Sequence, residues 1–178
     1  MIYLQKLVDM EHRLDFEDEL EHADVLQWLF FWHGSGAPCQ GQIKYFAKQA
    51  PEKVPCKYSS FSKRKFKLIT DCSQYSIAID RFKDETLRVF GVLEIRLSGR
   101  YTGEPRDYLA GAGKGKYSLA DIRTWPWVNV WGKVSGFTGE EMEPFPHVLK
   151  WLDRIAERPA VQRGSGPGYN KPTVPPME

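Results

Sequence analysis

Several side chains in this sequence have types and spacings that suit chemistry. Ser118 and Asp121 combine a hydroxyl with a carboxylate, as a nucleophile and its base would. Cys39 supplies a thiol, which becomes a nucleophile when its surroundings lower its pKa. Each of these has a structural alternative.

For Ser118 and Asp121 the spacing favours the structural alternative. A serine followed three residues later by an acidic residue is the pattern of a helix N-terminal capping box. Tyr117 and Ile122 occupy the two positions of the accompanying hydrophobic staple. We therefore predict that Ser118 and Asp121 cap a helix and take no part in catalysis. The helix behind them is predicted to be buried, because apolar residues recur on nearly all its sides: Ile122, Trp125, Trp127, Val128, Val130 and Trp131.

The histidines and cysteines show no metal-ligand spacing, so we predict no metal site. The residues concerned are His12, His22, His33, His147, Cys39, Cys56 and Cys72. Three cysteines cannot all pair with one another, which argues against a disulfide scaffold and favours a reducing, cytoplasmic compartment. Cys39 is interpreted as a spectator thiol, since nothing in the sequence lowers its pKa.

Composition excludes several classes of protein. The chain has 178 residues, of which 42% are hydrophobic and 27% charged, as in a soluble globular protein. Its net charge of +2 is too small to indicate a nucleic-acid partner. No apolar run approaches the roughly 18 residues that a membrane helix needs, so no membrane partner is expected.

The elements that must position these residues are predicted to be helices. A first helix covers about 16–33, is ended by Gly34-Ser35-Gly36, and leaves Gln40 and Gln42 in the loop beyond it. A shorter helix covers about 42–49, and the clearest amphipathic pattern runs over 79–98. Residues 100–116 are glycine-rich and predict a loop, and a last long helix covers about 145–157.

One segment, residues 57–74, has no helical period and carries five cations and one anion. Without it the chain has 20 basic and 22 acidic residues, a net charge of −2, so the basic balance belongs to this segment alone. It is open to three interpretations: a solvated basic loop, an anion- or nucleic-acid-binding patch with interleaved aromatic residues, or a stretch foreign to the fold. We rank the third interpretation first.

Several blocks together resemble the C-terminal helical domain of a cytosolic glutathione transferase. They are YSLADI, PHVLKWLDRIAERPAVQRG and the turn YLAG. The blocks LQWLFFWHGSGAPCQGQ, APEKVP, AIDRF and ADIRTWPWVNVW are similar to the fungal nitrogen-regulator-like (Ure-type) class and its bacterial disulfide-reductase relatives. The resemblance covers residues 1–56 and 77–164.

This resemblance implies an all-α, glutathione transferase C-terminal-like helical bundle over residues 15–164. Residues 1–14 would be a remnant of the last helix and linker of a thioredoxin-like domain. The family has no counterpart for residues 57–77, which we interpret as a non-native insertion translated from a retained intron, with a real loop specific to this protein's own subfamily as the alternative. Residues 165–178 are predicted to be a disordered tail, because they are rich in glycine and proline.

The same resemblance implies a function. In the family, glutathione is the co-substrate for conjugation to a small electrophile or for disulfide reduction, and the protein is a homodimer. The groups that activate glutathione lie in the thioredoxin-like domain, so the chain as written is expected to be truncated and weakly active or inactive. The alternative is a non-catalytic helical protein-interaction module.

The site residues follow from the resemblance. Arg81 and Gln42 are expected to bind glutathione, with an Arg81–Glu85 surface ion pair as an equal alternative for the arginine. Gln40 is a candidate substrate contact, for which capping of a loop is the commoner role. An apolar substrate pocket would be lined by aromatic side chains that more often pack in a core or a dimer: Phe31, Trp32 and Tyr45.

Overall fold

The structure, a computed structural model, describes residues 1–50 and 76–166. The predicted insertion at 57–77 lies outside the described residues apart from its last two positions. The predicted tail lies outside them apart from residues 165 and 166. In the described part the elements are helical, with one isolated bridge between Ala110 and Lys116. The all-α fold class predicted from the sequence is therefore confirmed.

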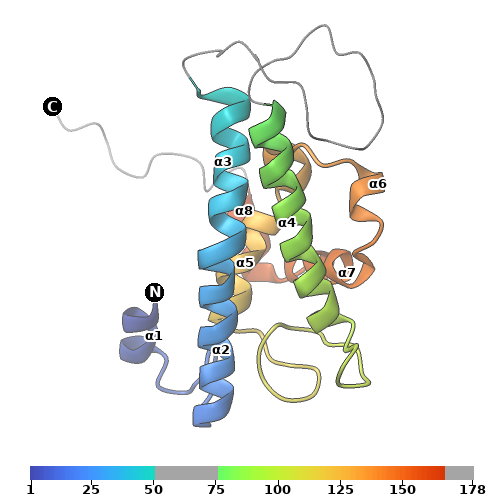
Figure 1. The fold of residues 1–178 in the computed structure, drawn as a ribbon. Helices are drawn as coiled ribbons and strands as arrows, with labels where there is room; N and C mark the ends of the chain where they lie inside the picture. The colour runs from blue at the N-terminus through green and yellow to red at the C-terminus, as the bar shows by residue number, and fades with distance from the viewer. Residues whose placement is uncertain (51–75, 167–178) are drawn as a thin grey trace, which may run out of the picture.

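The bundle is built around one long rod and a second helix beside it (Figure 1). The rod consists of α2, the π-helical turn η1 and α3, and α4 runs alongside it, with α5 and α7 behind. The element bounds are α1 Ile2–Val8, α2 Glu19–Phe31, η1 Trp32–Gly36, α3 Ala37–Lys48, α4 Ser76–Leu97, α5 Leu119–Val128, η2 Trp131–Ser135, α6 Gly139–Met142, α7 Pro146–Ala156 and α8 Pro159–Ser165.

Aromatic contacts fix how the rod and α4 meet. Trp32 stacks on Phe90 with ring centroids 6.3 Å apart, and Phe46 stacks on Phe82 at 5.9 Å. Later residues of the rod thus meet earlier residues of α4, so the two helices are antiparallel. The seam continues into a core of fully buried apolar side chains from α4 and α7, which include Leu93, Val148, Trp151 and Ile155. Burial of this apolar surface is the main force that holds the bundle together.

The prediction that Gly34-Ser35-Gly36 ends the first helix is wrong. The chain passes through these residues as a π-helical turn and continues directly into α3. Gly36 is required there because a Cβ at this position would lie 2.4 Å from the ring of Trp32. The loop predicted for Gln40 and Gln42 is also wrong, since both residues lie on α3. Glycine here admits a large buried ring and does not break the helix.

We expect Gly36→Ala to lower the free energy of unfolding by about 2 kcal/mol, because the added methyl group displaces a fully buried indole. Gly34→Ala is the matched control in the same turn, since no atom lies within 4 Å of its added Cβ. It should stabilise the chain by about 0.5 kcal/mol through helix propensity. Urea unfolding of both variants tests this, and equal effects would contradict the role assigned to Gly36.

Two arginines hold the loop that follows α4 in place through hydrogen bonds to its backbone carbonyl oxygens. Gly99 ends the helix with a φ of +66°, and a Cβ there would meet the carbonyl oxygen of Glu104 at 1.7 Å. Arg106 donates to the carbonyl oxygens of Gly111 and Gly113. Arg96 donates to the carbonyl oxygen of Leu109 at 2.8 Å. The glycine-rich stretch is therefore a loop, as the sequence indicates, and it is closely held.

Helix α5 is shorter than the apolar pattern suggests. It ends at Val128, two residues after the internal Pro126, which has no N–H to bond the preceding turn. Trp125 and Val128 are buried, whereas Trp127 and Trp131 are half-buried. The expectation of burial on nearly all sides holds only for the inner face of this helix.

Candidate functional site

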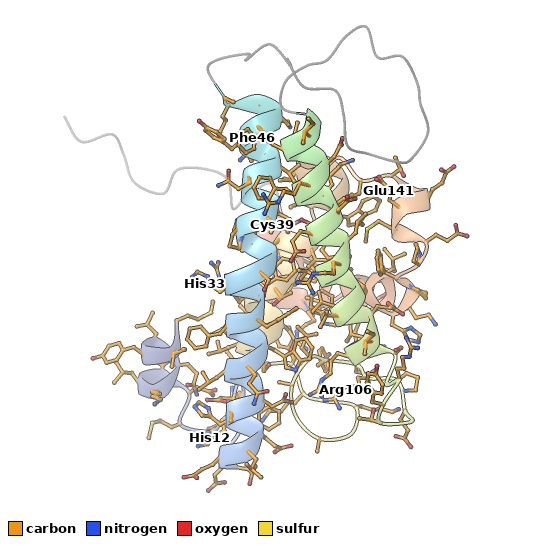
Figure 2. The ribbon with its side chains drawn as sticks, in the orientation of Figure 1. His12, His33, Cys39, Phe46, Arg106 and Glu141 are labelled. Atoms are coloured by element: carbon orange, nitrogen blue, oxygen red, sulfur yellow. The ribbon has the colours of Figure 1, made fainter. Side chains whose placement is uncertain are left out.

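The end of the α3–α4 pair nearest Lys48 gathers three of the residues predicted to bind ligands. Gln42 and Tyr45 lie on α3, and Arg81 lies on α4 immediately before Phe82. The Phe46–Phe82 stack sets the register, and the ring of Tyr45 meets that of Phe46 edge-on at 5.3 Å. Figure 2 shows Phe46 on α3 at this end of the pair, beyond Cys39. All three candidate side chains are exposed to solvent.

The guanidinium of Arg81 forms no hydrogen bond or ion pair with any described residue. The ion pair considered for it, with Glu85, is not formed. Glu85 is instead bound by Arg88, whose Nε and terminal nitrogen donate to the carboxylate at 2.9 and 2.7 Å. This hydrogen bonding lowers the pKa of Glu85. The Arg81 guanidinium therefore remains available to a carboxylate from outside the chain.

Cys39 lies on the same seam, where the charges of Glu85, Arg88 and Arg81 reach it. Burial raises the pKa of its thiol, Glu85 raises it further, and the two arginines oppose the rise. The thiol is therefore protonated at neutral pH and is not an activated nucleophile. This agrees with its interpretation as a spectator.

The structure places the other predicted pocket residues away from this exposed end. Trp32 and Gln40 are fully buried, the first against Phe90 and the second with its Nε2 donating to Ser135 Oγ at 3.0 Å. Phe31 is half-buried and meets Trp28 edge-on at 5.6 Å. Trp32 and Gln40 thus belong to the packing beneath the α3–α4 surface.

The capping box at the start of α5 is part of a larger buried network. Asp121 Oδ2 accepts the N–H of Ser118 at 3.0 Å and its hydroxyl at 3.2 Å. Asp121 Oδ1 accepts the indole N–H of Trp151 at 2.9 Å and the backbone N–H of Leu109 at 3.1 Å. Ser118 and Asp121 are both fully buried, so neither meets a substrate.

Burial dominates the ionisation of this carboxyl. It raises the pKa of Asp121 to about 6, against the opposing effect of the four hydrogen bonds. The network joins the loop before α5 to α5 and α7. Its role is to hold the bundle in shape.

Sequence reasoning missed two ion pairs of α4, Arg88–Glu85 near the candidate site and Arg96–Asp24 near the other end of the helix. Arg88 follows Arg81 by seven residues on the same helix, so helical periodicity could have placed it beside the candidate site. Arg96 pairs with Asp24, 72 positions away, and Asp24 also accepts the N–H of Gly111 at 3.0 Å. No local pattern signals a contact across that distance.

Over residues 1–50 and 76–166, no three His, Cys, Asp or Glu side chains gather in a way that could hold a metal ion. In the same ranges no helix is both long and apolar enough to span a bilayer.

Comparison with known proteins gives a consistent family. The family model for the glutathione S-transferase C-terminal domain matches residues 51–159. The chain is 36% identical to the glutathione S-transferase-like protein tpcF of Aspergillus fumigatus, over 91% of this chain and 63% of that protein. It is 34% identical to the disulfide-bond oxidoreductase YfcG of Escherichia coli, over 79% of this chain and 50% of that protein. The chain thus spans only part of the length of these relatives.

Solved structures show the same likeness. The glutathione transferase URE2P6 of Phanerochaete chrysosporium, in complex with oxidized glutathione, matches with a TM-score of 0.66 and 29% identity, over 90% of this chain and 60% of that one. A glutathione transferase of Burkholderia graminis, with two glutathione molecules bound per subunit, matches with a TM-score of 0.67 and 28% identity, over 98% of this chain and 58% of that one.

Proposed function

The chain belongs to the glutathione S-transferase family, and from that premise we propose that it serves glutathione-dependent conjugation or disulfide reduction. Its relatives include a transferase-like protein and a disulfide-bond oxidoreductase, which supports both reactions. The second substrate would accordingly be a small electrophile or a disulfide. The observation that carries the proposal is the guanidinium of Arg81 at the exposed end of the α3–α4 pair, which has no ion-pair partner among residues 1–50 and 76–166.

We assign binding of glutathione to Arg81 and Gln42. Glutathione carries two carboxylates, and a guanidinium pairs with a carboxylate through two parallel hydrogen bonds. The amide of Gln42 adds a donor and an acceptor that suit the peptide groups of glutathione. Tyr45 is the proposed apolar contact for the second substrate at this end of the α3–α4 pair, and Phe31 is proposed as a separate apolar contact farther along the rod. Trp32 and Gln40 would act from the core, by fixing the position of α3 behind that surface.

The chemical step needs a group that stabilises the glutathione thiolate. The described residues singled out above do not supply one, because Cys39 holds its proton and the Ser118 hydroxyl is buried against Asp121. In the family this group belongs to the thioredoxin-like domain. We therefore propose that the helical domain binds and positions the reactants, and that on its own it is weakly active or inactive.

Partner and compartment are proposed on the same basis. We propose a cytoplasmic homodimer that meets through the α2–α3 rod and α4. Large apolar side chains are exposed on these helices, among them Leu20, Phe30 and Ile77, with exposed fractions of 81%, 59% and 63%. Exposed side chains of this size favour burial against a second surface.

We expect Arg81→Ala to weaken binding of glutathione to the full chain at least tenfold, because a charge-assisted pair with a carboxylate is lost. Isothermal titration calorimetry measures this directly. Arg81→Lys should recover part of the affinity, since it keeps the charge but loses the fork geometry. Arg100→Ala is the matched control, because Arg100 is another exposed arginine, located beyond the opposite end of α4.

Two results would overturn this assignment. Equal affinities for the parent chain and Arg81→Ala would remove Arg81 from the glutathione site. No detectable binding of glutathione to the parent chain would refute the proposed function for this chain and favour the helical interaction module instead.

A further inference from the structure

A cavity of about 320 Å³ lies between α1, the segment that follows it, and the first turns of α2. A wider hollow of about 600 Å³ adjoins it and shares His12, Phe16 and Glu17 in its lining. Figure 2 shows His12 in this region, where the chain passes from α1 to α2. The assignments made above for glutathione and its second substrate leave this cavity unused.

Two buried polar atoms in the lining have no hydrogen-bond partner within the described residues. They are Oε1 of Gln5 and Nδ1 of His12. Gln5 is only 6% exposed, so its amide is withdrawn from water as well. A buried polar atom without a partner costs about 1 to 3 kcal/mol, so such an atom calls for an explanation. A ligand that donates hydrogen bonds to both atoms would supply one.

The charges around the cavity favour a cation, because its four carboxylates outnumber its one lysine, Lys6, even with Asp15 paired to His22. Among its carboxylates, Asp9 is already used by the N–H groups of Arg13 and Leu14, at 2.7 and 2.8 Å. Glu17 and Glu19 are exposed and form no ion pair with any described residue. Two free carboxylates at the mouth of the cavity would attract and hold positive charge.

The chain itself shows how an ammonium group binds here. In the adjoining hollow, Nζ of Lys116 donates to the carbonyl oxygen of His12 at 2.8 Å. The same ammonium lies 4.4 Å from the centroid of the Phe16 ring. An aromatic face combined with an oxygen acceptor is a favourable environment for a lysine ammonium. The neighbouring cavity offers the same kinds of group, and the lysine in its lining, Lys6, is exposed and forms no hydrogen bond or ion pair with any described residue.

We propose that this cavity binds an aliphatic diamine. One ammonium group donates to Oε1 of Gln5 and to Nδ1 of His12, with the His12 proton on Nε2. The alkyl chain lies against the apolar side chains of Met10 and Phe16. The second ammonium group meets the carboxylates of Glu17 and Glu19.

The test uses the full chain and 1,4-diaminobutane as the probe, followed by two-dimensional amide NMR. We expect saturable shifts confined to residues in and around 5–22. 1,4-Butanediol has the same length but no charge, and it should produce no shifts at equal concentration. Gln5→Leu should weaken the affinity for the diamine at least tenfold. Gln27→Leu, at an exposed glutamine of α2, is the matched control and should bind as the parent chain does.

Three results would overturn the proposed diamine site. Shifts of equal size with the diol, or equal affinity in Gln5→Leu and the parent chain, would overturn it, as would an absence of shifts in the parent chain. If circular dichroism shows that Gln5→Leu does not fold, Glu17→Gln takes its place, because Glu17 is exposed and its amide keeps the size of the side chain. Unchanged affinity in Glu17→Gln would then refute the site.

Discussion

Replacing Asp121 with alanine is expected to lower the free energy of unfolding by about 3 kcal/mol at pH 7. The Asp121 carboxylate accepts four hydrogen bonds, from the N–H and hydroxyl of Ser118, the N–H of Leu109 and the indole of Trp151. Loss of a helix cap alone would cost about 1 kcal/mol. The expected cost is larger because the buried donors of Leu109 and Trp151 also lose their acceptor.

Urea unfolding of the parent chain and of Asp121→Ala measures the difference, provided that both transitions have the same slope. Asp153→Ala is the matched control, since Asp153 is an exposed aspartate on α7 and its loss should change stability by less than about 0.5 kcal/mol. A cost below about 1 kcal/mol for Asp121→Ala would show that water replaces the carboxylate, and that the network contributes little beyond the cap.

The local part of this network was predictable and the rest was not. The spacing of Ser118 and Asp121 predicts a capping box because both partners lie within one helical turn. The Leu109 and Trp151 donors come from a loop 12 residues earlier and a helix 30 residues later. Their approach depends on how α5 packs against α7, which periodicity does not specify. The sequence therefore predicts a structural role for Asp121 but not how much Asp121 contributes to the free energy of unfolding.

In the α2–α3 rod, by contrast, it was the local sequence pattern that gave a wrong prediction. The segment Gly34-Ser35-Gly36 has the composition of a helix stop, and a local rule predicts a break there. The Trp32 ring packs against Phe90 of α4 and lies over Gly36, four residues later in the same turn, so the absence of a side chain at Gly36 permits this packing. Because Gln40 was placed in this predicted loop, it was predicted to contact the substrate, although it is buried.

The grouping of Arg81, Gln42 and Tyr45 at one end of a helix pair depends on the antiparallel register of α3 and α4. Periodicity predicts each helix but not which residues face each other across the seam. The aromatic stacks of Phe46 on Phe82 and Trp32 on Phe90 set that register. The resemblance to the family predicts these three residues as binding residues without specifying which of them lie close together. Their binding roles remain predictions that the Arg81 variants test.

The second large effect is a dependence of stability on pH that comes from the same carboxyl. Burial raises the pKa of Asp121 from 3.8 to about 6 in the folded chain. The folded state therefore binds the proton more tightly than the unfolded state does. Stability from this group is fully present below the unfolded pKa and is lost as the pH rises through the folded pKa. A shift of about two pKa units corresponds to about 3 kcal/mol.

Comparison with Asp121→Asn isolates this contribution, because asparagine keeps the size of the side chain and does not titrate. We expect the stability advantage of the parent chain over Asp121→Asn to shrink by about 2 kcal/mol between pH 4 and pH 7, because part of the full effect is already lost at pH 4. Urea unfolding at intervals of half a pH unit would show the change between the two pKa values. An advantage that stays constant with pH would mean that the four donors offset the cost of burial and keep the carboxylate ionised throughout. An advantage that grows with pH would reverse the sign of the shift.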